Sequence, residues 1–190
     1  MKKIITLTIA IIGLHFISHA QAQAYDGYND IKMFIGYTNI GGNSGIEYQT
    51  DKGVNDLYSW GLQATYLINT KVDNDGVGYE KGFKFLDSAD AGIFIRFHFL
   101  EALKLPKNID LYLGGDLTAK SLGAHTGFKY NISNTIGFYA MYKQSFAPVL
   151  KGDITLSEDR NGDPIPSFFA KKAALSAGIT FNLNRRYFFE

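Results

Sequence analysis

The chain has 190 residues and a formal net charge of +1, from 19 basic and 18 acidic residues. This near-neutral balance gives no argument for nucleic acid as a partner, and the absence of cysteine excludes a disulfide framework and a thiolate metal site. Aromatic residues make up 15% of the chain, and there are 20 glycines. That combination is typical of β-architecture with many turns, or of a barrel with aromatic girdles.

Residues 1–24 have the pattern of a secretory signal peptide. Lys2 and Lys3 precede the mostly apolar residues 4–17, and two small-residue cleavage sites end at Ala22 and Ala24. A retained membrane anchor is the alternative, but the apolar run is short for a span. We therefore expect an exported chain with one mature domain, residues 25–190, and cleavage after Ala22 or Ala24. Loss of the two lysines leaves 17 basic residues against 18 acidic ones.

Three alternating segments open the mature chain. Residues 31–39 place apolar side chains at every second position, and a two-residue period predicts a strand with two different faces. The following GGNSG has turn composition, and residues 46–50 predict a short second strand. After a turn at residues 51–56, residues 57–68 predict a longer strand, which leads into the polar first long loop, residues 69–88.

Three further segments alternate in the same way. Residues 89–99 and 109–117 predict the fourth and fifth strands, with a connection at residues 101–108 between them. A short turn at residues 118–121 leads to the sixth predicted strand, residues 122–131. No run of 18 apolar residues follows the leader, so we expect no transmembrane helix.

Two last segments flank the second long loop, residues 147–170. The seventh predicted strand covers residues 135–146, after a turn at residues 132–134. The eighth, residues 171–183 (KKAALSAGITFNL), has the clearest alternation of the chain. It is about as long as a tilted strand must be to cross a hydrocarbon layer.

These segments predict an all-β fold, an eight-stranded antiparallel up-and-down transmembrane β-barrel. Both long loops fall at one end and the other end has only short connections, which is the asymmetry of outer-membrane barrels. A soluble barrel with its apolar face inside is the alternative. Aromatic residues near the strand ends favour the membrane, where they form girdles: Tyr37, Tyr48, Tyr58, Trp60, Tyr66, Tyr130 and Tyr142.

The last strand resembles the assembly motif of bacterial outer-membrane proteins. In that motif a polar residue is followed by glycine and then by two alternate hydrophobic or aromatic residues. Ser176, Gly178, Phe181 and Leu183 have this order, and residues 187–189 (YFF) offer a second register. The resemblance implies recognition by the barrel-assembly machinery.

The mature chain as a whole resembles small eight-stranded barrels of the OmpA/OmpX type. It is more similar still to uncharacterised short outer-membrane barrel families, through residues 123–142 and the ending ALSAGITFNL. The resemblance implies a porin-like architecture in the outer membrane of a Gram-negative type of cell. It implies no particular activity.

The predicted inward face carries many ionisable side chains, and buried charges need partners. An eight-stranded interior is just wide enough for side chains to fill. We therefore expect a polar plug, with a narrow channel for water or small solutes as the alternative. The expected inward set is Lys32, Glu47, Gln49, Gln63, Asp90, Arg96, His98, Asp110, Asp116, His125, Lys129 and Lys143. The expected plug balances the basic residues Arg96, Lys129 and Lys143 with the acidic residues Glu47, Asp110 and Asp116.

No constellation in the sequence predicts an enzyme. His98 and His125 are expected inside, and satisfied interior histidines are the simpler interpretation because no nucleophile accompanies them in a motif. A lipid-modifying barrel enzyme is the alternative, but Ser88 and Ser167 in the loops have no histidine partner. We predict no catalytic, cofactor-binding or metal-binding residues and no cofactor.

Two loop segments have some features of a calcium loop. Residues 73–76 (DNDG) and 159–163 (DRNGD) offer oxygen ligands and a glycine, but both lack the closing glutamate of an EF-hand. Ordinary turn chemistry explains them as well. The sequence therefore predicts a monomeric barrel with a structural or surface-interaction role through loops 69–88 and 147–170. Its expected partners are outer-membrane lipid and the assembly machinery, with no nucleic acid and an unknown external partner.

Overall fold

The computed structural model describes residues 23–28, 30–70, 85–150, 154–158 and 162–183. Most of the expected leader therefore lies outside the described residues. The same is true of residues 73–76 and residues 159–161 of the two calcium-like segments, and of residues 187–189. Among the described residues, no helix has the length and apolar character needed to cross a membrane.

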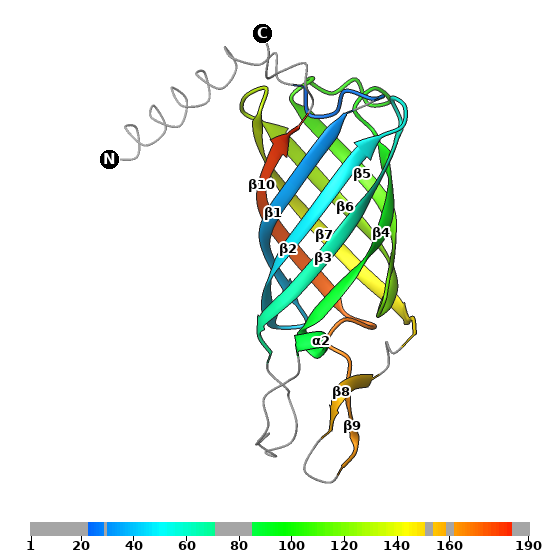
Figure 1. Cartoon of the computed structure of the whole chain (residues 1–190). Coiled ribbons are helices and arrows are strands. Elements are labelled where there is room, and N and C mark those ends of the chain that lie inside the picture. Colours follow the sequence, from blue (N-terminus) through cyan, green and yellow to red (C-terminus); the bar gives the residue numbers. More distant parts are fainter. Residues whose placement is uncertain (1–22, 29, 71–84, 151–153, 159–161, 184–190) are drawn as a thin grey trace, which may run out of the picture.

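Eight antiparallel strands close into a barrel in the order β1-β10-β7-β6-β5-β4-β3-β2 (Figure 1). This confirms the predicted fold class. The strands are β1 Ile31–Ile40, β2 Asn43–Gly53, β3 Tyr58–Asn69, β4 Ala89–His98, β5 Ile109–Thr118, β6 Ser121–Asn131, β7 Ile136–Pro148 and β10 Ala173–Asn182. The clearly alternating last segment is β10, and it closes the barrel by pairing with β1, where Gly178 lies opposite Gly36.

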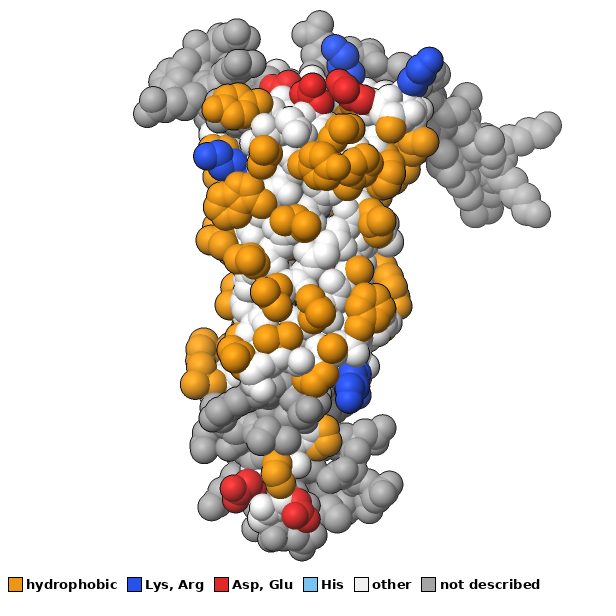
Figure 2. Space-filling model, turned by 90° about the vertical axis from the view of Figure 1, so that its right-hand side faces the viewer, with side chains coloured by type: hydrophobic (Ala, Val, Ile, Leu, Met, Phe, Trp, Pro, Cys, Tyr) orange, Lys and Arg blue, Asp and Glu red, His pale blue; other side chains and the backbone are white. Residues whose placement is uncertain are grey.

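The alternating sequence gives the barrel wall two different faces. On β4, Ile93 and Ile95 are exposed on the outside while Arg96 and His98 are buried inside. Hydrophobic side chains are distributed along the whole wall seen in Figure 2, and charged side chains lie mainly towards its two ends. The faces are therefore those of a membrane barrel rather than of a soluble barrel with an apolar interior.

The second strand is longer than the sequence predicted. Residues 46–50 were the expected strand, whereas β2 runs from Asn43 to Gly53. Asp51 is the physical reason, because its carboxylate points into the barrel and pairs with Arg96. A DKG tripeptide that is typical of a turn therefore continues the strand.

The two ends of the barrel differ. The long-loop end carries the short helix α2 (Phe85–Ser88) and a hairpin of β8 (Ile154–Glu158) and β9 (Pro164–Pro166), which the sequence did not predict within loop 147–170. The short-turn end carries the start of β1 and the end of β10 (Figure 1). There, residues 23–28, called the N-terminal segment below, lie against the mouth of the barrel through a hydrogen bond from Ala24 to Lys107.

Candidate functional site in the barrel interior

All twelve residues predicted to face inward lie inside the barrel. Eleven of them are buried, and the side chain of Lys143 is 12% exposed. Each buried ionic or polar group loses its hydration, so its contacts determine whether the interior is stable. The interior network is therefore the candidate functional site.

Arg96 lies at the centre of this network and is 1% exposed. Its guanidinium donates from Nη1 to Asp51 Oδ2 at 2.9 Å, from Nε to His125 Nε2 at 2.9 Å, and from Nη2 to Gln49 Oε1. The same group lies over the ring of Phe94 at 4.0 Å and of Tyr112 at 4.5 Å. One side chain of β4 thus connects β2 with β6 across the barrel.

The protonation of His125 follows from its two partners. The Arg96 Nε–H can only donate, so His125 Nε2 accepts and Nδ1 carries the proton. His125 Nδ1 then donates to Asp116 Oδ2 at 2.8 Å. Asp116 also accepts from Gln63 at 3.0 Å and lies 3.7 Å from Lys143 Nζ. Lys143 and Asp116 both belong to the set of charges that the sequence predicts to balance one another inside the barrel.

His98 joins a second carboxylate nearer the short-turn end. Its Nδ1 lies 2.8 Å from Asp110 Oδ2 and its Nε2 lies 2.8 Å from Ser59 Oγ. Lys129 Nζ is 3.2 Å from the same Asp110 oxygen, although this ion pair lacks the alignment of a hydrogen bond. Because a neutral imidazole accepts at Nε2 when Nδ1 donates, the Ser59 hydroxyl donates to His98.

Tyr25 of the N-terminal segment covers this second group. Its ring stacks on His98 with centroids 3.5 Å apart, and the planes are inclined by 5°. Its hydroxyl lies 2.6 Å from the carbonyl oxygens of both Asn55 and Tyr58. Burial raises the pKa of the Tyr25 phenol, and the nearby carboxylate of Asp51 raises it further. The phenol is therefore held in its neutral form.

Asp51 is the acid that pairs directly with Arg96, and the expected set of balancing acids did not include it. Glu47 instead accepts from Gln49 at 2.7 Å and lies 3.3 Å from both the Tyr139 hydroxyl and the Ser176 hydroxyl. The reason is the extra length of β2, which brings Asp51 inside.

Aromatic side chains are buried at the long-loop end of the interior. Phe168 and Phe169 are buried with Ile40, Leu67 and Ala174 in one apolar cluster. A cavity of about 20 Å³ lies on the interior side of this cluster, and its lining includes Glu47 and Lys143. A volume of that size holds a single water at most.

Five buried polar atoms among the described residues have no hydrogen-bond partner. They are Asp51 Oδ1, Asp110 Oδ1, Tyr112 Oη, Lys129 Nζ and Asn131 Oδ1. Buried polar groups of this kind are commonly satisfied by internal water. Internal water between Arg96 and the short-turn end would satisfy most of these five atoms.

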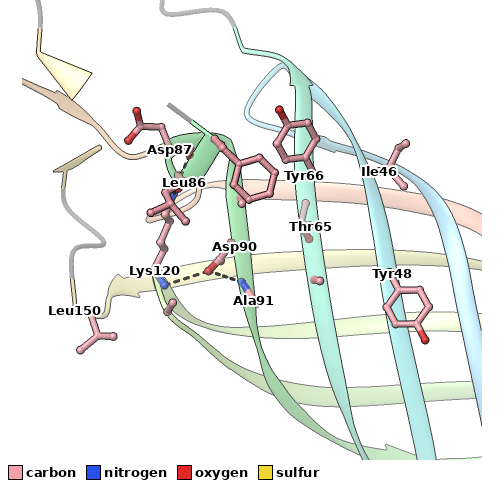
Figure 3. A pocket seen from close by; sticks show the side chains of 14 residues that line it. Ile46, Tyr48, Thr65, Tyr66, Leu86, Asp87, Asp90, Ala91, Lys120 and Leu150 are labelled. Carbon is pink, nitrogen blue, oxygen red and sulfur yellow. Dashed lines mark hydrogen bonds between the residues drawn. The ribbon is translucent and has the colours of Figure 1, made fainter. Parts of the chain in front are cut away.

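A groove of about 1060 Å³ marks the outer wall at the long-loop end (Figure 3). The stacked rings of Tyr66 and Phe85, 5.2 Å apart, form part of its lining. Lys120 Nζ donates to the carbonyl oxygens of Leu86 at 2.6 Å and Asp87 at 2.8 Å, and burial lowers the pKa of this lysine. Because two backbone carbonyls engage the Lys120 ammonium, the surface of the groove is apolar, like the rest of the barrel exterior.

Sequence reasoning missed three residues of the network. The sequence predicts a turn at Asp51 and assigns no role to Ser59, and Tyr25 lies outside every alternating segment. Only the register of β3 with β4, which sets Ser59 opposite Arg96, brings Ser59 near His98. No group of three or more metal-ligating side chains occurs within the described part of the chain.

The fold and its interior define a class: a closed eight-stranded antiparallel barrel with a polar interior and an apolar exterior. The chain belongs to the family of unknown function DUF6646, which it matches over residues 14–183. It is similar to a solved structure described as "De novo design of transmembrane beta-barrels", with a TM-score of 0.53 and 6% sequence identity. The alignment covers 83% of this chain and 98% of that one, and at this identity it shows the fold alone. A search of curated proteins found no match.

Proposed function

We propose that this protein is an exported barrel of the outer membrane whose interior is closed to solutes and whose outer loops carry a structural or surface-interaction role. The observation that carries the proposal is the reach of Arg96 across the interior, from β4 to Asp51 on β2 and His125 on β6. In a barrel just wide enough for its own side chains, such a bridge leaves no room for a solute path.

The exterior supports the membrane part of the proposal. Exposed apolar side chains lie at mid-strand, with Ile95 66% exposed and Leu113 51% exposed. The barrel strands have 10 to 13 residues, which suits a tilted strand that crosses a hydrocarbon layer. Closure also pairs every strand with two neighbours, as the bilayer interior requires. By this proposal the long-loop end faces outward, and barrel-assembly machinery inserts the chain as a monomer.

Planar-bilayer recording tests the closed interior. The purified full chain should add no steady conductance above the lipid baseline, because the Arg96 bridge separates the two mouths. The same sample must first migrate faster on a gel unheated than heated, which shows that the barrel is folded. A steady, size-selective current from folded protein would refute the closed interior.

A narrow water path is the second candidate, and the five unpartnered polar atoms favour it. Most of them lie between Arg96 and the short-turn end, so water is expected there first. Osmotic shrinkage of vesicles distinguishes the candidates. Vesicles that contain the protein should shrink at the rate of empty vesicles if the bridge excludes water, and faster if a continuous path exists.

By the same proposal the protein is no enzyme, although Ser59, His98 and Asp110 have the hydrogen-bond order of a catalytic triad. All three side chains are buried, and Tyr25 covers the face of His98. A serine-directed phosphonate probe should therefore leave Ser59 unlabelled, and labelled outer-membrane lipid should give no product. Labelling that disappears in Ser59→Ala would overturn this part of the proposal.

A further inference from the structure

The N-terminal segment is built into the short-turn mouth of the barrel. Ala24 is fully buried, and its N–H donates to the Lys107 carbonyl at 2.7 Å. One residue earlier, the Gln23 carbonyl accepts from Asn131 Nδ2 at 2.8 Å. Two residues that a cut after Ala24 would remove therefore make specific contacts with the barrel.

Tyr25 anchors the segment by its side chain. Tyr25 is 3% exposed and its ring stacks on His98. Its hydroxyl reaches the carbonyl oxygens of Asn55, in the turn between β2 and β3, and of Tyr58, at the start of β3. A stacked aromatic pair with a satisfied hydroxyl is a favourable way to bury a tyrosine. By contrast Tyr28, three residues later, is 71% exposed.

The chain between the anchor and the first strand is equally specific. Gly27 has a φ of +68° and approaches β2 so closely that a Cβ on Gly53 would lie 1.9 Å from the Gly27 carbonyl oxygen. Asp30 then accepts from the Asp26 N–H at 3.1 Å and pairs with Lys32 Nζ at 2.8 Å. The path of the segment is thus fixed by contacts on both sides of Tyr25.

We infer that the leader is cut after Ala22, so that Gln23 is the mature N-terminus and residues 23–28 act as a built-in ligand of the short-turn mouth. This inference rests on the proposed export. A leader peptidase adds water across the Ala22–Gln23 peptide bond, which leaves a carboxylate on Ala22 and an amine on Gln23. Cleavage after Ala22 and cleavage after Ala24 both fit the preference for small residues at the cleavage site. Only cleavage after Ala22 preserves the hydrogen bonds of Gln23 and Ala24.

Intact mass and N-terminal sequencing of the chain from a membrane fraction test the cut. A chain that begins at Gln23, whether with a free amine or cyclised with loss of ammonia, supports the inference. A chain that begins at Tyr25 refutes it while leaving export intact. An unprocessed chain from Met1 refutes the inference and counts against the proposed export as well, so the two failures are distinguishable.

Amide hydrogen exchange of the folded mature protein tests the docking. The Ala24 amide should be protected because it donates to Lys107, and Tyr25→Ala should speed its exchange by about tenfold or more, since local opening sets exchange. The matched control Tyr28→Ala removes an exposed ring from the same segment and should leave the rate unchanged. Unprotected exchange at Ala24 in the unaltered protein would refute docking even if Tyr25→Ala fails to fold.

Discussion

Replacing Arg96 with methionine is the most direct test of the interior network. The substitution keeps an unbranched apolar stem but removes the charge that Asp51 and His125 contact at 2.9 Å each. Asp51 is 3% exposed, and one of its oxygens already has no partner. The variant therefore leaves an uncompensated carboxylate inside the barrel.

The expected loss of unfolding free energy is about 3–5 kcal/mol, the range for breaking a buried ion pair by removal of one partner. This range includes the lost interaction of the guanidinium with the rings of Phe94 and Tyr112, which is worth about 2 kcal/mol at a desolvated site. By the same reasoning the double variant Arg96→Met with Asp51→Leu should recover most of the loss, because apolar replacement of a whole buried pair is often neutral.

Urea unfolding of the protein in lipid vesicles measures the loss. With a slope of about 2 kcal/mol per molar urea, the midpoint should fall by about 1.5–2.5 M. Lys52→Met is the matched control, because Lys52 is exposed on β2 beside Asp51, and its removal should change stability by no more than about 0.5 kcal/mol. A loss below about 1 kcal/mol for Arg96→Met, or a double variant weaker than the single one, would refute the reasoning.

Three further predictions follow from other contacts. Because burial raises the pKa of Tyr25 above its ordinary value of 10.0, the docked segment should be fully stable below about pH 10 and should lose stability progressively as the pH rises towards the raised pKa. The phenolate difference spectrum between the protein and Tyr25→Phe should therefore show a late titration, and a titration at the ordinary value would contradict this. Gly178→Ala should prevent barrel closure, because the new Cβ would lie 2.2 Å from the Ile35 carbonyl oxygen. The control Gly115→Ala has room for its Cβ and should still close. Heat-modifiable migration on a gel shows whether each variant forms the barrel. Ile95→Arg should lower the free energy of unfolding in lipid vesicles by about 2–4 kcal/mol. An unchanged free energy of unfolding would mean that this face meets water.

The sequence was sufficient to predict the barrel wall because alternation is a local property. A strand such as β10 shows its two faces residue by residue, and the register with β1 follows once one face must meet lipid. The inward positions of Arg96, His98 and His125 follow from the same period. The wall could therefore be predicted without knowledge of any distant contact.

The contacts of the interior could not be predicted in the same way. Asp51 and Arg96 are 45 residues apart in the sequence. Whether their side chains meet depends on the register of β2 with β3 and of β3 with β4. Tyr25 has no periodicity because a segment outside the strands places it. The contacts of residues at a barrel mouth or across the interior thus depend on strand register and on the paths of the loops. The two-residue alternation of the sequence predicts neither.

The proposed closed interior has three barriers in series: Tyr25 at the short-turn mouth, Arg96 in the middle and Phe169 at the long-loop end. This proposed arrangement predicts how a channel could be engineered. The narrowest of several barriers in series sets the conductance, so Tyr25→Ala, Arg96→Met or Phe169→Ala alone should record the lipid baseline in planar bilayers. Current should appear only when all three are combined in a variant that still shows heat-modifiable migration. A steady current from Tyr25→Ala alone would mean that the interior behind it was already open, and would refute the closed barrel.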